Sequence, residues 1–164
     1  MAFLDALPVG MESHQEYLVI NASGEATPEE IVSLLNSNLP EGLWIRDCCG
    51  QSSGTDKAEA FVSTYRITAV ERIFDEKQID VSLKKSDWNI QRTNRKGKTR
   101  QIDLKQALLE FERVSGSELQ VTLRSTRGYV VRPGEVVAYV FDLPPDEHRR
   151  LRVIKTANHI EPAA

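Results

Sequence analysis

The sequence predicts an α+β fold of two small subdomains, each with helices packed on one face of an antiparallel or mixed sheet. Three observations predict this class. A strand-helix-strand pattern occupies residues 16–46, a polar loop follows it, and strands then alternate with short helices in the second half. The 164 residues are enough for a core of ordinary size, and no apolar run approaches the roughly 20 residues that cross a bilayer.

The helix of the first half has an unusually complete start signal. Thr27 is the predicted N-cap, Pro28 takes the first helical position, and Glu30 closes a capping box back to Thr27. Apolar residues at helical spacing continue as far as Leu39, which predicts one apolar face.

A strand is expected on each side of this helix. Residues 16–20 are rich in β-forming residues, and residues 43–46 begin a second strand after a Pro-Glu-Gly break. We therefore expect residues 1–60 to form an acidic β-α-β half that is incomplete. The Gly- and Ser-rich segment 49–60 is the expected boundary between the halves.

Residues 61–157 are expected to form an α+β half that contains a basic hairpin. Alternating apolar residues predict its strands, while capping residues and an early proline predict its helices. The expected elements are strand 61–69, helix 75–86, hairpin strands 88–92 and 98–102, a helix from Asp103 through Phe111, strand 119–123, a helix opened by Pro133, strand 150–154, and a disordered tail at 158–164.

Charge is distributed unevenly along the chain. Residues 1–64 hold two basic and ten acidic residues, whereas residues 65–164 hold 19 basic and 14 acidic, so that net charges of −8 and +5 sum to −3. Residues 84–105 alone contain eight basic residues against two acidic ones. Such asymmetry favours an anionic partner on one side of the molecule.

The hairpin at 92–100 is the segment with a physical argument for binding. Its five cations repel each other, and phosphates would relieve that repulsion; five phosphate contacts predict a log–log salt slope of about −3.5. Trp88 would offer a stacking face to a base. The alternative is a solvated tip that protects a sheet edge, with Trp88 packed inward. The predicted RNA- or anion-binding residues are Lys84, Lys85, Trp88, Arg92, Arg95, Lys96, Lys98 and Arg100.

No catalytic or metal-binding pattern stands out in the sequence. The three histidines lack partners at metal-ligand spacing, and the adjacent Cys48 and Cys49 lack the gap that zinc sites use. There is no phosphate-binding glycine loop and no nucleophile elbow. We therefore expect no catalytic residues, no metal and no cofactor. Free thiols and the absence of a secretory signal predict a cytoplasmic protein.

A set of motifs spread over residues 2 to about 156 resembles the bacterial radical SAM-linked protein family, a domain of unknown function. Members usually carry a basic segment ahead of this point, so the resemblance implies an N-terminally truncated member. The motifs are Ala2-Phe3, Ala6–Ser13 with Glu16–Leu18, Leu39–Leu43, Lys96–Lys98 leading to Ile102–Leu104, and Arg132-Pro133 with Glu135-Val136.

The resemblance implies a protein encoded beside, or fused to, a radical SAM enzyme. Two adjacent cysteines agree with a protein that has no iron–sulfur cluster of its own. The order of elements, with a helix ending at Leu39–Gly42 and a later Tyr65–Ile67, is also similar to tRNA pseudouridine synthases. The catalytic Asp of their Arg-Thr-Asp motif has no counterpart, so this similarity implies a shared fold and RNA as a partner, without the activity.

Two functions follow from the sequence. The first is a non-catalytic accessory domain that docks a radical SAM enzyme, which predicts a contiguous apolar patch exposed on the isolated chain. The alternative is an RNA-binding module that uses the hairpin at 92–100. The expected partners are a radical SAM protein and RNA, with neither DNA nor a membrane.

Overall fold

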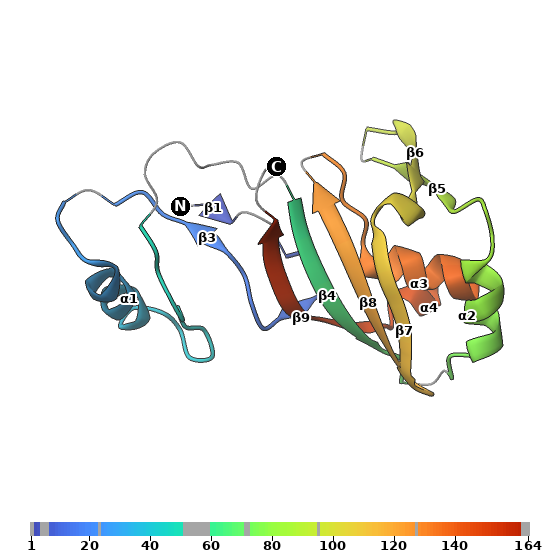
Figure 1. Cartoon of the computed structure of the whole chain (residues 1–164), viewed down its shortest axis with the longest axis horizontal. Helices are drawn as coiled ribbons and strands as arrows, with labels where there is room; N and C mark the ends of the chain where they lie inside the picture. The colour runs from blue at the N-terminus through green and yellow to red at the C-terminus, as the bar shows by residue number, and fades with distance from the viewer. Residues whose placement is uncertain are drawn as a thin grey trace.

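A five-stranded mixed sheet forms the centre of the structure, a computed structural model (Figure 1). The structure describes residues 2–3, 7–22, 24–50, 60–70, 73–94, 96–126 and 128–161. Neighbouring strands are antiparallel, except that the strand at Glu12–Ser13 pairs in parallel with the strand at Arg152–Glu161. In spatial order the strands are β2 (Glu12–Ser13), β9 (Arg152–Glu161), β4 (Ala60–Thr68), β8 (Glu118–Thr126) and β7 (Leu108–Ser115).

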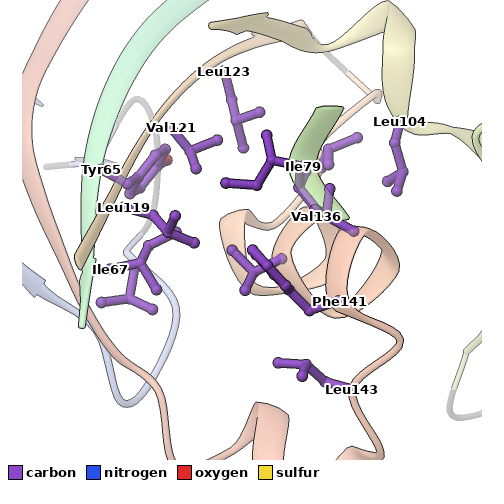
Figure 2. Close-up of a cluster of buried hydrophobic side chains, with 14 of the residues drawn as sticks. Tyr65, Ile67, Ile79, Leu104, Leu119, Val121, Leu123, Val136, Phe141 and Leu143 are labelled. Atoms are coloured by element: carbon purple, nitrogen blue, oxygen red, sulfur yellow. The ribbon is translucent and has the colours of Figure 1, made fainter. Parts of the chain in front are cut away.

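Helices α2 (Glu76–Leu83), α3 (Pro133–Phe141) and α4 (Pro145–His148) lie on one side of this sheet (Figure 1). Alternation along the central strands turns one set of side chains toward α2 and α3, where they are buried. Figure 2 shows how the two layers of this core face each other. Its members include Ile67, Leu119 and Val121 from the sheet and Ile79, Val136 and Phe141 from the helices.

A separate two-stranded hairpin lies beyond α2 in the chain. It consists of β5 (Asn89–Thr93) and β6 (Thr99–Asp103), and a single 3-10 turn, η1 (Leu104–Gln106), leads from it into β7. Gly97 at its tip has a φ of +77°, the positive value that the turn was expected to need.

The N-terminal region contains short strands and one helix. β1 (Ala2–Phe3) pairs with β3 (Leu18–Val19), and α1 (Pro28–Asn36) follows. The predicted capping box is present, with Glu30 N donating to Thr27 Oγ1 at 3.3 Å and Thr27 N to Glu30 Oε2 at 2.8 Å. No residue of α1 is buried.

The α+β class predicted from the sequence is confirmed, but the first half differs from the expected β-α-β unit. Residues 43–46 are not a strand, and the strand expected at 16–20 has two residues. Instead, Ile45 N donates to Asn36 Oδ1 at 2.7 Å, which ties this extended segment to the end of α1. A side chain satisfies the backbone here, so no neighbouring strand is required. Most of the expected boundary segment, residues 51–59, lies outside the described residues.

The prediction of a helix from Asp103 through Phe111 is wrong. Asp103 does cap a turn, because Lys105 N donates to its Oδ1 at 3.0 Å, but only η1 forms there. The chain then becomes β7, which places Phe111 opposite Val121 of β8. Pairing with β7 satisfies the backbone groups on one edge of β8, and this outweighs the helical spacing of the apolar residues.

The prediction of a disordered tail at 158–164 is also wrong for its first four residues. Residues 158–161 continue β9, and Asn158 is fully buried. Residues 162–164 lie outside the described part of the chain. No helix among the described residues has the length and apolar character that a bilayer crossing would require.

Candidate functional site

The arginines of the β5–β6 hairpin hold it to the body of the protein. Arg92 Nε donates to Glu135 Oε1 at 2.9 Å, its Nη2 bonds to the other oxygen of that carboxylate, and its Nη1 donates to the Val130 carbonyl at 2.9 Å. Arg100 lies opposite Arg92 in the register and donates to the Gly128 carbonyl at 3.3 Å. Two of the predicted RNA-binding cations therefore anchor the hairpin.

Glu135 links this anchor to the start of α3. Its Oε2 also accepts the backbone N–H of Arg132 at 2.9 Å, so one carboxylate both caps the helix and holds the hairpin. The side chains of Arg92 and Glu135 are 24% and 14% exposed. A bidentate, half-buried pair of this kind has fixed geometry, unlike a mobile surface ion pair.

Trp88 is a core residue, and this corrects the stacking role predicted for it. Its side chain is 1% exposed, its Nε1 donates to the Ser82 carbonyl at 3.2 Å, and its ring lies 5.0 Å from that of Tyr139. No face of the indole ring is open to a base. The inward-packed alternative weighed from the sequence describes the residue correctly.

Two tyrosine hydroxyls donate hydrogen bonds to backbone carbonyls at the base of the hairpin. Tyr129 donates its hydroxyl to the Asp103 carbonyl, and Tyr139 donates to that of Asp87. Burial raises the pKa of both phenols above 10, and the nearby Asp carboxylates raise it further. Both hydroxyls therefore remain neutral donors at physiological pH.

The exposed lysines of the predicted set fall into two groups. Lys96 and Lys98 are exposed at the hairpin tip, where both backbone N–H groups donate to Asn94 Oδ1 at 2.9 and 3.0 Å. Lys84 and Lys85 are exposed beyond the end of α2, and the Lys85 ammonium lies 5.6 Å from the centre of the Tyr139 ring. The predicted Arg95 lies outside the described residues.

An acidic arm, which we define as residues 24–50, carries α1 and the segment after it. It contains five acidic residues and one basic residue. Three large apolar side chains are exposed there: Leu34 at 68%, Leu43 at 57% and Trp44 at 61%. The predicted apolar helix face exists, but none of it is buried. The apolar Leu43-Trp44 pair within an acidic segment was the sequence signal for an open surface.

A groove opens where the loop after β4 meets the end of α3. Its volume is about 780 Å³. Two aliphatic side chains at its edge are almost fully exposed, Val70 at 87% and Ile73 at 77%. The sequence analysis missed this feature, although two aliphatic residues on either side of a Glu-Arg pair were its signal. The lining residues are Ala69, Val70, Ile73, Leu143, Glu147, Arg150 and Leu151.

A third feature, absent from the sequence prediction, is a clasp that joins residues 12–17 to β9. Arg152 donates hydrogen bonds from Nε and Nη2 to the two carboxylate oxygens of Glu12, both at 2.9 Å. These hydrogen bonds hold the pKa of Glu12 below 4.5 and raise the pKa of Arg152. Glu16 lies 3.0 Å from the ammonium of Lys155, whose side chain is 1% exposed. Lys155 lies two residues after the buried Val153, on the same face of β9, and that inward register was the signal for it.

The described residues hold no group of three or more His, Cys, Asp or Glu side chains placed to bind a metal ion. Cys48 is half-buried and Cys49 is exposed, and both are free thiols. The candidate surfaces among the described residues are the acidic arm, the groove and the lysines of the hairpin tip.

A family model described as "Uncharacterized protein conserved in bacteria (DUF2344)" matches residues 1–133. This range includes the acidic arm and the hairpin, and it ends at the first residue of α3. No curated protein and no solved structure matches the chain.

Proposed function

The chain belongs to the DUF2344 family of uncharacterized proteins conserved in bacteria, and from this premise we propose that it is a non-catalytic accessory domain that docks a radical SAM enzyme through its acidic arm. The resemblance of its ordered motifs to radical SAM-linked proteins supplies the identity of the partner. The exposed apolar surface of the arm supplies the means of docking.

The observation that carries this proposal is a helix without a buried residue. Helix α1 has nine residues, and isolated helices of this length are marginal in water, so most helices owe their stability to packing of an apolar face. Leu34 of this helix, and Leu43 and Trp44 in the segment after it, are each more than half exposed. A partner that covers this face would supply the missing packing.

The composition of the arm indicates what the partner surface must be. Leu34 on α1 and Leu43 and Trp44 after it are apolar anchors that fit a hydrophobic groove, and Trp is enriched among the residues that dominate binding energy. The net charge of −4 on the arm would steer it toward a groove bordered by Lys and Arg. We therefore expect the radical SAM enzyme to present an apolar groove with a basic rim.

The test is capture of the radical SAM protein encoded beside this chain. Tagged full-length chain would be recovered from its native bacterium with RNase present, and retained proteins identified by mass spectrometry. The double variant Leu34→Ser with Trp44→Ser should lose the enzyme. Val81→Ser, which changes an aliphatic residue 61% exposed on α2, is the matched control and should retain it. Failure of the wild-type chain to retain the enzyme, or equal retention by the arm variant, would overturn the proposal.

RNA binding by the hairpin tip is the second candidate function. The observation that favours it is the exposure of Lys96 and Lys98 on either side of Gly97. Because Arg92 and Arg100 bond to the body of the protein, three of the five cations remain at the tip, Arg95, Lys96 and Lys98. They predict a log–log salt slope of about −2.1, smaller in magnitude than that predicted for five.

The experiment is titration of single-stranded RNA by fluorescence anisotropy over a range of salt concentrations. Lys96→Ala with Lys98→Ala should weaken binding and flatten the salt slope. Lys77→Ala on α2 removes an exposed lysine outside the predicted set and should leave both unchanged. Equal losses in the two variants would contradict recognition by the hairpin tip.

A further inference from the structure

The β5–β6 hairpin has an outward face that neither enzyme docking nor the tip lysines use. Cross-strand partners in a hairpin share a face, and the face that carries Arg92 and Arg100 turns toward the body of the protein, where both side chains are bonded. Alternation along each strand therefore turns their neighbours to solvent. Four exposed, uncharged polar residues occupy this outward face as two cross-strand pairs, Gln91 with Gln101 and Thr93 with Thr99.

The side chains of the outward face are free to bond to another molecule. Each glutamine amide offers a carbonyl acceptor and two N–H donors, and neither the Gln91 nor the Gln101 amide has a hydrogen-bond partner among the described residues. The Thr93 and Thr99 hydroxyl oxygens lie 2.9 Å apart and bond to each other. The face is therefore a ladder of donors and acceptors without charge, which suits a partner rich in hydroxyl groups.

Exposed lysines frame this face at both ends of the hairpin. They are Lys96 and Lys98 at the tip, and Lys84, Lys85 and Lys105 at the base. The Lys105 ammonium donates to the Lys85 carbonyl at 3.0 Å, which brings the base lysines together. None of the five forms an ion pair with a carboxylate in the described part of the chain. The five residues of β6 separate the two groups of cations by about 17 Å.

The aromatic rings beside the hairpin are closed to a nucleic-acid base. Trp88 is buried, and the ring of Tyr139 has Trp88 at 5.0 Å and the Lys85 ammonium at 5.6 Å. Tyr129 is half-buried, with its hydroxyl bonded to the Asp103 carbonyl. Proteins hold single strands largely by stacking bases on exposed aromatic rings. Cations without such rings favour a double helix, whose bases already stack on each other.

The anchoring of the hairpin favours RNA over DNA as this double helix. A two-stranded ribbon reads DNA by entering the deep major groove, but Arg92 and Arg100 hold one face of this hairpin against the body of the protein. Only the outward face can be presented, which requires a shallow groove. The minor groove of double-helical RNA is wide and shallow and displays 2′-hydroxyls, whereas that of DNA is about 6 Å wide and has none.

We propose that the outward face of the β5–β6 hairpin binds the minor groove of double-helical RNA. Gln91 and Gln101 bond to 2′-hydroxyls, and the lysines at the tip and the base contact phosphates on either side. The inference rests on the second candidate function, RNA binding. It names the class of RNA and adds two residues that recognise it. Figure 1 shows the hairpin at the end of the molecule far from α1, so bound RNA would leave the acidic arm open.

Fluorescence anisotropy with three labelled probes tests the class of nucleic acid. The probes are an RNA duplex of about 20 base pairs, a DNA duplex of the same sequence, and one strand of the RNA alone, all at one salt concentration. The full chain should bind the RNA duplex about 10-fold more tightly than the DNA duplex, because only RNA offers hydroxyls to the two amides. Single-stranded RNA should also bind more weakly, through the lysines alone.

Two variants separate hydroxyl recognition from phosphate contact, with folding checked by circular dichroism. Gln91→Ala with Gln101→Ala should weaken RNA-duplex binding about 10-fold, remove the preference over DNA and leave the salt slope unchanged. Lys84→Ala with Lys85→Ala should weaken both duplexes alike and lower the magnitude of the slope by about 1 for each lysine. Gln120→Ala, on β8, is the matched control and should bind like the wild-type chain.

The outcomes distinguish this inference from RNA binding itself. Equal affinity for the RNA and DNA duplexes, tighter binding of the single strand, or a preference for RNA that survives in the glutamine variant would overturn the inference and leave RNA binding in place. Absence of binding to both forms of RNA would overturn the second candidate function together with the inference.

Discussion

Lys155 places a positive charge in the interior of the protein, next to the sheet. Its side chain is 1% exposed, and Glu16, which reaches it from the N-terminal segment, is 19% exposed. A charge removed from water is tolerated where an opposite charge and hydrogen bonds compensate for the lost solvation. The pair therefore fixes the N-terminal segment that carries Glu16 against strand β9, which carries Lys155.

Replacement of Glu16 should show how much the buried charge depends on this partner. Glu16→Gln is expected to lower the free energy of unfolding by about 2 kcal/mol, because it removes the carboxylate that lies 3.0 Å from a buried ammonium. Urea unfolding followed by circular dichroism measures the change. Glu41→Gln, at an exposed position, should stay within about 0.5 kcal/mol of the wild-type chain. An equally small effect of Glu16→Gln would contradict the role of the pair.

Gly134, near the start of α3, is a position where close packing decides which residue fits. A methyl group there would overlap the imidazole of His148 from α4. Gly→Ala in a helix normally stabilises by about 0.5–1 kcal/mol, but here the overlap should reverse the sign and cost about 1–3 kcal/mol. In a His148→Ala background the same substitution should be neutral or stabilising. Thermal unfolding of the four variants in this cycle would test both statements.

At the scale of the element, strand β2 shows how two residues can hold a chain segment. β2 pairs with β9 over two positions only, but a bidentate contact between Glu12 and Arg152 reinforces it. Tyr17 adds a hydrogen bond from its hydroxyl to the Asn158 carbonyl at 3.1 Å. The clasp therefore positions the start of the N-terminal region, from which the acidic arm continues.

The Glu12 contact makes part of the stability depend on pH. The folded-state pKa of Glu12 lies below the ordinary value of 4.5. Its contribution to the free energy of unfolding is therefore fully present above about pH 4.5, and it is lost as the pH falls through the folded-state pKa. The difference in free energy of unfolding between the wild-type chain and Glu12→Gln should therefore shrink between about pH 6 and pH 3. Urea unfolding at several pH values would measure it. A difference that stays constant or grows at low pH would contradict the clasp.

At the scale of the whole molecule, the two tryptophans report on two different regions. Trp88 is 1% exposed in the core, and Trp44 is 61% exposed on the acidic arm. The core and the arm also differ in how their helices are stabilised, since α3 buries six residues and α1 buries none. The arm should therefore be less protected than the core against local opening.

Single-tryptophan variants measure this contrast. In dilute Trp44→Phe, the remaining Trp88 should emit at short wavelength and shift to longer wavelength on unfolding. In dilute Trp88→Phe, whose folding is checked by far-UV circular dichroism, the remaining Trp44 should already emit like a solvated indole and be quenched readily by acrylamide. A short-wavelength emission from Trp44 at low concentration would show that the arm is covered within a single chain.

Local signals allowed much of the secondary structure to be predicted. The capping box at Thr27, the helix opened by Pro133, the strand near Tyr65 and the turn at Gly97 depend on neighbours within a few residues. Each of these features is settled by backbone geometry and local hydrogen bonds. The helix expected after Asp103 failed because pairing between β7 and β8 is not a local property.

The sequence by itself determined the α+β class, the positions of most helices and strands, and the uneven distribution of charge. Only the tertiary structure decided which charges remain available to a partner. Arg92 meets Glu135 across 43 residues, and Lys155 meets Glu16 across 139. Whether α1 is covered likewise depends on what the rest of the chain places beside it. Local patterns carry no information on such distant neighbours, and burial and ion pairing are properties of those neighbours.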